Sequence, residues 1–268
     1  MRQLLSFELR KLVRSKSIYI CLIVMVCLKI IGVVIAKATM DMFDGFQSMV
    51  DMDEMGGMFS YSGIKYLLSA CNGSNMWIFM AIFVTIFICT DFTEGTMKNI
   101  VARGFGRDKI FFAKSIVICI GSILFGIVSM LVGFLSGSIA FGVGKGFSGS
   151  MAVALLVQLL ALMAYTMMNV LLAVLFGKLG GAITLGIIIP LVYPLLIQLL
   201  DILIVLVADD PSKVRNDFFS RFTVGTNLSK ISDIGASGSD IVFAAVIFGV
   251  YISLFTLLGI LVIRKKEV

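Results

Sequence analysis

Histidine is absent from this sequence, and its absence removes several classes of enzyme. Residues 146–149 read Gly-Phe-Ser-Gly, a pattern typical of rhomboid intramembrane proteases. Those proteases need a histidine to activate the serine, because a serine hydroxyl alone is a weak nucleophile. Zinc proteases with a His-Glu-x-x-His motif are excluded for the same reason. We therefore interpret residues 146–149 as a glycine-rich turn.

A phosphate-binding loop for nucleotides is also missing. Residues 142–146 read Gly-Val-Gly-Lys-Gly, which has the Gly-Lys pair of the Walker motif. Ile139 stands where that motif has its first glycine, and Gly146 stands where it has serine or threonine. We expect no catalytic residue, cofactor site or metal site in this chain, so the sequence does not predict an enzyme.

Charged residues are scarce. Charged residues make up 14% of the chain, whereas a soluble domain has about 25%. Hydrophobic residues make up 59%, whereas a soluble domain has about 45–50%. The mean hydropathy is +1.07. Four of the five cysteines fall in apolar runs and no loop contains two, so we expect no disulfide framework. The composition indicates a protein whose solvent is mostly lipid.

Six apolar runs have roughly the length that a helix needs to cross a bilayer, about 20 residues. The predicted spans are residues 18–36, 75–90, 115–140, 151–176, 182–207 and 241–263. They predict an all-α polytopic membrane protein with one transmembrane domain over residues 1–268. The second span is short, and Pro190 and Pro194 predict a kink or break in the fifth.

The basic residues indicate an orientation. Fourteen lysines and arginines fall in one set of segments and seven in the other. The richer set is 1–17, 91–114, 177–181 and 264–268, and the poorer set is 37–74, 141–150 and 208–240. The positive-inside rule then predicts that both termini are cytoplasmic and that 37–74 and 208–240 are outer segments. The basic residues form no continuous stripe, so we do not expect nucleic acid as a partner.

The first residues form a predicted amphipathic helix that would lie in the membrane interface before the first span. Apolar residues recur at helical spacing, and these are Leu5, Leu9, Leu12 and Val13. The expected polar surface contains Glu8, Arg10, Lys11 and Arg14.

A second short helix is predicted within the cytoplasmic loop 91–114. Thr93 is its expected N-cap, Glu94 and Arg103 suit the helix dipole, and Gly104 is the expected left-handed C-cap. Met97, Ile100 and Val101 would share one face. Held between two spans, such a helix could pass the motion of a soluble partner into the membrane. An ordinary basic loop that only fixes the topology is the alternative.

These two regions resemble the permease subunits of type-2 ATP-binding-cassette exporters. Such permeases often show an acidic residue, three variable residues and Gly-Thr-x-Lys-Asn, followed by a basic Gly-x-x-Arg-x-Lys stretch and a lysine at the next span. The matching residues here are Glu94, Gly95, Thr96, Lys98, Asn99, Gly104, Arg107, Lys109 and Lys114. Residues 8–16 resemble the family's elbow helix. The resemblance covers residues 1–36 and 76–135, and the C-terminal half matches only in hydropathy and number of spans.

The resemblance implies a mechanism. Two permease subunits, identical or different, would surround a central path in the lipid membrane. Separate ATPase subunits, which bind ATP and Mg, would grip the elbow and the loop helix and drive a substrate outward. The implied ATPase-coupling residues are Glu94, Gly95, Thr96, Met97, Lys98, Asn99, Ile100 and Arg103. The closest fit is to small bacterial exporters of antimicrobial or amphipathic peptides, of the bacitracin-resistance and lantibiotic-immunity type.

Two features leave other interpretations open. Lys29 lies inside the first span, where it either reaches the outer interface by snorkelling or faces the substrate path. Met49, Met52, Met55 and Met58 recur every third residue, as an apolar surface or as soft copper ligands. A membrane anchor for a cytosolic partner and a secondary transporter also remain as functions. A secondary transporter should carry paired ionisable groups near the midplane.

Overall fold

The computed structural model describes residues 1–50, 62–72, 74–144, 146–207 and 218–265. These residues form helices and turns and contain no strand. Six of the described helices are long and apolar enough to cross a bilayer. They are α2 (Lys16–Val50), α4 (Ser74–Thr93), α6 (Arg107–Phe141), α7 (Gly149–Phe176), α8 (Leu179–Val207) and α10 (Gly238–Lys265). The predicted all-α polytopic fold is confirmed.

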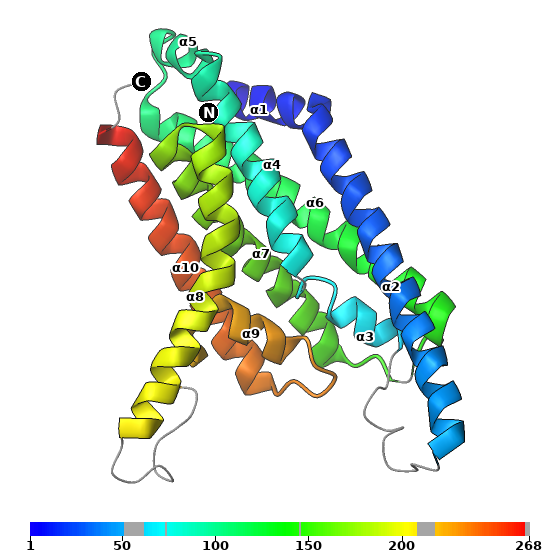
Figure 1. Ribbon diagram of the computed structural model, residues 1–268. Coiled ribbons are helices and arrows are strands. Elements are labelled where there is room, and N and C mark those ends of the chain that lie inside the picture. Colours follow the sequence, from blue (N-terminus) through cyan, green and yellow to red (C-terminus); the bar gives the residue numbers. More distant parts are fainter. Residues whose placement is uncertain (51–61, 73, 145, 208–217, 266–268) are drawn as a thin grey trace.

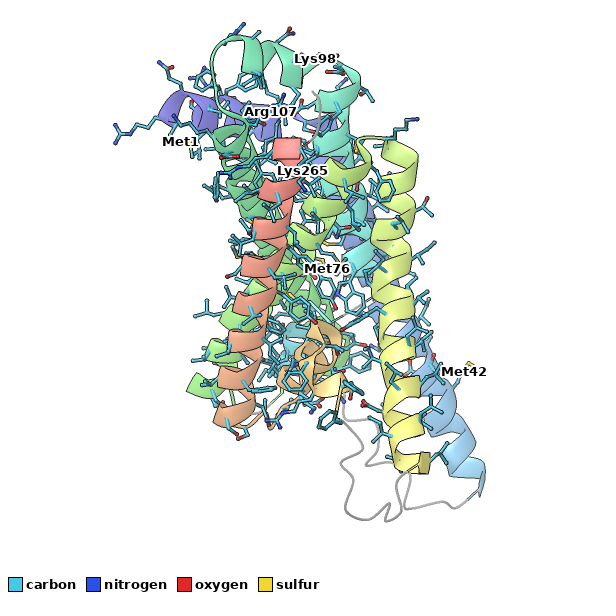
Figure 2. The ribbon with its side chains drawn as sticks, turned by 90° about the vertical axis from the view of Figure 1, so that its left-hand side faces the viewer. Met1, Met42, Met76, Lys98, Arg107 and Lys265 are labelled. Carbon is cyan, nitrogen blue, oxygen red and sulfur yellow. The ribbon has the colours of Figure 1, made fainter. Side chains whose placement is uncertain are left out.

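Shorter helices lie towards the two ends of this bundle (Figure 1). Helices α1 (Arg2–Arg14) and α5 (Thr96–Ala102) lie at one end, which we call the elbow end. The labelled Met1 and Lys265 lie at the same end (Figure 2). Helices α3 (Gly63–Leu68) and α9 (Val224–Ile231), with the 3₁₀ turn η2 (Ser220–Phe222), lie in the other half, the far half.

The centre of the bundle is formed by α4, α6 and α7. More than half of the apolar window of each is buried, against 11% for α8 and 22% for α2 and α10. Phe83, Phe111 and Phe125 are among the largest fully buried side chains in this core. The outer helices leave many leucines, isoleucines and valines exposed, as expected of surfaces that contact lipid or another subunit.

Helix α3 explains why the second span is short. It packs against α6, and α4 begins beside Met76, which lies about midway along the bundle (Figure 2). The close approach of α3 to α6 depends on glycine in α6, because a Cβ at Gly137 would lie 2.8 Å from the Tyr66 ring. A short helix and its turn therefore occupy the depth that a longer α4 would have filled.

Helix α8 runs without interruption through Pro190 and Pro194. Of the kink or break expected there, the break is therefore wrong, whereas α8 changes direction about midway along its length, as a kink requires (Figure 1). Each proline lacks a backbone N–H, so the carbonyl group four residues earlier has no helical donor, although the helix continues. Helix α8 packs against α4 and α7.

Candidate functional site

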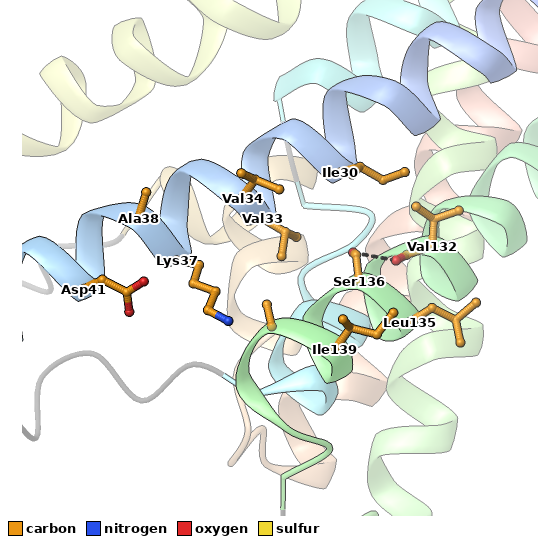
Figure 3. A pocket seen from close by; sticks show the side chains of 11 residues that line it. Ile30, Val33, Val34, Lys37, Ala38, Asp41, Val132, Leu135, Ser136 and Ile139 are labelled. Carbon is orange, nitrogen blue, oxygen red and sulfur yellow. Dashed lines mark hydrogen bonds between the residues drawn. The ribbon is translucent and has the colours of Figure 1, made fainter.

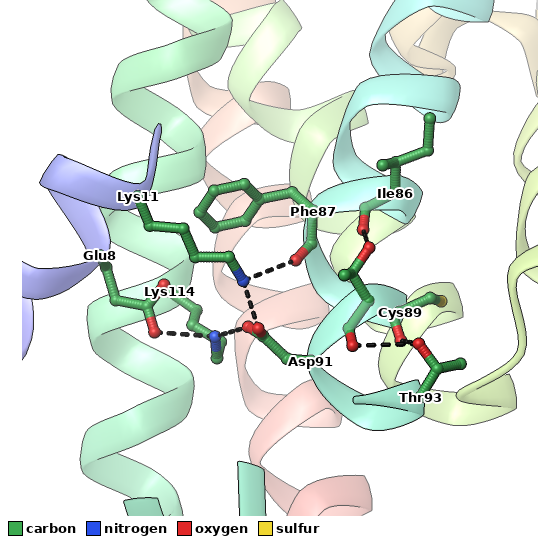
Figure 4. A network of polar contacts seen from close by, with 9 residues as sticks. Glu8, Lys11, Ile86, Phe87, Cys89, Asp91, Thr93 and Lys114 are labelled. Carbon is green, nitrogen blue, oxygen red and sulfur yellow. Dashed lines mark hydrogen bonds and ion pairs between the residues drawn. The ribbon is translucent and has the colours of Figure 1, made fainter. Parts of the chain in front are cut away.

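Four charged side chains meet at the elbow end, between α1, α4 and α6 (Figure 4). Lys114 of α6 donates to the Glu8 carboxylate of α1 at 2.8 Å and to Asp91 of α4. Lys11 of α1 donates to the other oxygen of Asp91 and lies 4.7 Å from the centre of the Phe87 ring. We call Glu8, Lys11, Asp91 and Lys114 the buried quartet.

The quartet has no net charge, and three of its four side chains are almost fully buried. Glu8 is 0% exposed, Asp91 1% and Lys114 4%, while Lys11 is half-buried. Two carboxylates and two ammonium groups sum to zero, so no net charge is taken out of water. A buried ion pair holds its charges only while both partners remain, because an unpaired buried charge is costly. The quartet therefore fixes the elbow helix to the ends of two core spans.

The importance of these four residues was only partly visible in the sequence. Glu8 was expected on the polar surface of the elbow helix, and that expectation is wrong, because Leu4, Glu8 and Leu12 form the buried face of α1. The signal was present, since Asp91 and Lys114 lie at the edges of apolar runs. No spacing rule pairs charges that are 23 and 106 positions apart.

The rest of α1 faces outward. Arg10 and Arg14 are exposed, as predicted, and so is Val13, whose side chain was expected on the apolar face. A groove of about 540 Å³ runs along this side, between Leu5 and Leu9 and the two arginines. The elbow helix thus presents an apolar strip with basic edges.

The predicted loop helix exists as α5. It begins after Gly95, whose φ of +69° is a left-handed conformation that favours glycine. Gly104 also has a left-handed backbone, with φ of +86°, as expected of the helix end. Thr93 is not the N-cap, because it is the last residue of α4 and its hydroxyl donates to the Cys89 carbonyl at 3.2 Å (Figure 4).

The apolar side of α5 faces its own chain. Met97 is 2% exposed and Ile100 8%, and both belong to the main hydrophobic core. Both are among the coupling residues that the resemblance implies, but the core of their own chain covers them, so they offer little surface to a partner. Their burial fixes α5 rigidly on the spans.

The outward side of the loop is polar. Glu94, Lys98, Asn99 and Arg103 are exposed, whereas Thr96 and Val101 are half-buried. We call Glu94, Lys98, Asn99 and Arg103 the outward face of the loop. Beside it, Arg264 of α10 forms a two-pronged ion pair with Asp108 of α6 at 2.6–3.1 Å. The elbow end thus carries a rigid helix with an accessible, charged surface.

Lys29 does not snorkel outward. Its ammonium group donates to the Ala70 carbonyl at 2.6 Å, and the Ser129 hydroxyl donates to the same carbonyl at 2.8 Å. The Gln158 amide, from α7, donates to the Leu68 carbonyl at 2.7 Å. Three spans therefore satisfy the carbonyl groups that α3 leaves free at its C-terminal end, where a positive charge also suits the helix dipole.

This capping gives a testable expectation. In a background where Cys71 is the sole cysteine, Lys29→Met or Ser129→Ala alone should change thiol labelling little, because one donor to Ala70 remains. The double variant leaves a buried carbonyl unpaired, at a cost of about 1–3 kcal/mol. Cys71 is fully buried and adjacent to Ala70, so its labelling should accelerate more than the two single effects combined. Equal labelling in all four proteins would contradict the capping role.

The spans also form an apolar groove away from the elbow end. A groove of about 590 Å³ lies between α2 and α6 in the far half, with apolar walls and with Lys37 and Asp41 at its rim (Figure 3). Such walls suit the acyl chains of lipid. The predicted methionine run lies outside the residues whose side chains the structure describes, so the copper alternative stays a prediction.

A search of curated proteins finds no match to this chain. Comparison with protein families matches residues 4–197, which is more than half of the chain, to the ABC-2 family transporter protein. The match contains α1 from its third residue on, the whole loop with α5, and the first five spans apart from the end of α8. The chain therefore belongs to the ABC-2 family of transporter proteins, as a membrane-embedded permease component.

Proposed function

We propose that this permease is the membrane half of an ATP-driven exporter that moves a hydrophobic or amphipathic substrate out of a bacterial cell. The substrate class we propose is an antimicrobial or other peptide, as in the bacitracin-resistance and lantibiotic-immunity branch. Separate ATPase subunits would hold ATP and Mg, and a second permease subunit would complete the path. The elbow end would face the cytoplasm.

One observation carries this proposal. The elbow helix and the loop helix are joined to the ends of α4 and α6 by the buried quartet and by Met97 and Ile100. A force applied to the outward face of the loop would therefore reach two core spans without being absorbed by a flexible hinge. A loop that only fixed topology would need no such attachment.

The two alternatives make different demands on the structure. A secondary transporter should hold paired ionisable groups near mid-depth, but the buried quartet lies at the elbow end, and Lys29 binds backbone carbonyl oxygen. A membrane anchor would bind a cytosolic partner without moving a substrate.

Purification from native membranes in mild detergent should retain an ATPase, and vesicles that contain the complex should move substrate only with ATP. An ATPase that binds without any ATP-dependent transport would favour the anchor.

The orientation can be measured directly. Arg103 and Gly235 are both exposed, and a Cβ at Gly235 would meet no atom within 4 Å. In intact cells, an impermeant thiol reagent should label Gly235→Cys and should label Arg103→Cys only after permeabilisation. The opposite pattern would place the elbow end outside and remove the basis for coupling to an ATPase. Each variant serves as the control for expression of the other.

A further inference from the structure

Three of the six tyrosines meet at mid-depth in the bundle. Tyr165, Tyr193 and Tyr251 come from α7, α8 and α10, and each lies 11–14 residues from the elbow-end terminus of its helix. At 1.5 Å per residue these positions are about 16–21 Å along the span. Tyrosines in membrane proteins usually lie at the interfaces, where the hydroxyl reaches water. A group of them at mid-depth therefore requires another explanation.

The three side chains line one small cavity of about 50 Å³. The hydroxyl oxygens of Tyr193 and Tyr251 are 3.4 Å apart, and the Tyr251 and Phe255 rings lie 5.7 Å apart. Gly225 of α9 closes the cavity on the far side, where a Cβ would lie 3.5 Å from the Tyr165 hydroxyl. The space holds one small headgroup and no larger molecule.

Two prolines of α8, Pro190 and Pro194, also line this cavity. Proline has no backbone N–H, so Pro190 and Pro194 leave the carbonyl groups of Gly186 and Pro190 without their helical donors. The Oδ1 atom of Asn169 is buried without a hydrogen-bond partner, and a Cβ at Gly186 would lie 2.4 Å from it. The three tyrosine rings and the carbonyl groups freed by the prolines suit a ligand that brings N–H donors and positive charge.

We propose that this cavity, the tyrosine pocket, binds the ammonium or guanidinium headgroup of a cationic amphiphile. The aromatic faces attract a cation, and the freed carbonyl oxygens accept its N–H groups. The described lining residues include no carboxylate, so the site holds the cation weakly enough to release it, as transport requires. As a step in export this role rests on the proposed function, and it narrows the substrate class to amphiphiles with a basic group.

The chain carries its own reporter for binding. Trp77 is the only tryptophan and stacks on Tyr165, with ring centres 4.8 Å apart. The full-length permease in lipid nanodiscs is titrated with dodecylammonium and with dodecanol, which share the same alkyl chain. The ammonium should change Trp77 fluorescence saturably, and dodecanol should bind about tenfold more weakly. Equal affinities for the two compounds would overturn the proposal.

Two variants at Tyr193 separate the ring from the hydroxyl. Tyr193 is 40% exposed, so the bundle should tolerate both changes. Tyr193→Phe keeps the π face and should retain affinity within about threefold, whereas Tyr193→Leu should weaken dodecylammonium binding about tenfold. Val192→Leu, on the exposed neighbour, is the matched control and should bind normally. Undiminished binding in Tyr193→Leu would overturn the proposal. No ATPase is present, so failure here is distinct from failure of ATP coupling.

Discussion

Replacing Lys114 with methionine should destabilise the permease by about 3–5 kcal/mol, the usual result of removing one partner from a buried ion network. Lys114 contacts both Glu8 and Asp91. Without it, the fully buried Glu8 carboxylate loses its ion-pair partner among the residues that the structure describes. We expect a large fall in melting temperature in detergent and weak expression. The elbow helix should also become accessible to proteases.

A matched set of variants tests whether charge balance is the cause. Lys98→Met makes the same chemical change on the exposed surface of α5 and should shift the melting temperature little. Glu8→Gln combined with Lys114→Met leaves Lys11 and Asp91 paired, so it should recover much of the loss. If Lys114→Met melts like wild type, the quartet does not hold the elbow helix. If the double variant is as unstable as the single one, shape rather than charge dominates.

Exchanging the charges of the outward face should separate the permease from its ATPase. Glu94→Lys with Arg103→Glu keeps the net charge of the loop, and both residues are exposed, so folding should be unaffected. Each reversed residue would now face a like charge on the partner. A loss of about 2 kcal/mol weakens association roughly 30-fold. We expect loss of ATPase co-purification and of substrate-stimulated hydrolysis, with normal melting and oligomeric state.

A charge reversal in the far half of the protein is the control for this experiment. Asp233→Lys reverses a charge on an exposed residue of the far half and should leave ATPase binding intact. Ile100→Asp would be a poor test of coupling, because it puts a charge into the core and should lower stability instead. Full ATPase binding by the exchanged variant would mean that the outward face of the loop is not the contact surface.

The sequence predicted the spans well because each is a long apolar run, and hydropathy alone detects such runs. It missed α3, a six-residue helix whose position depends on Gly133 and Gly137 of a different span. It also predicted a kink or a break at Pro190 and Pro194, because the local rule for proline does not say which of the two occurs, and α8 is continuous there.

Of the candidate site, too, the sequence predicted one part and missed another. The loop helix was predicted from its capping signals, but the direction of its apolar face was not, because helical periodicity says which residues share a face and not what covers it. Met97 and Ile100 were therefore assigned to a partner when they belong to the core. The contact of Lys29 was not predicted for a related reason: its acceptor, the Ala70 carbonyl, lies 41 residues away in the chain.

The buried quartet also sets an order of events during synthesis. Glu8 leaves the ribosome 106 residues before Lys114, which is roughly 5–20 s at ordinary rates of translation. During that interval the carboxylate has no ammonium of α6 to meet, so it remains in water and the elbow helix cannot dock. Docking begins only after α6 has emerged. The elbow helix of this permease is thus synthesised first but docks late, after the third span has emerged.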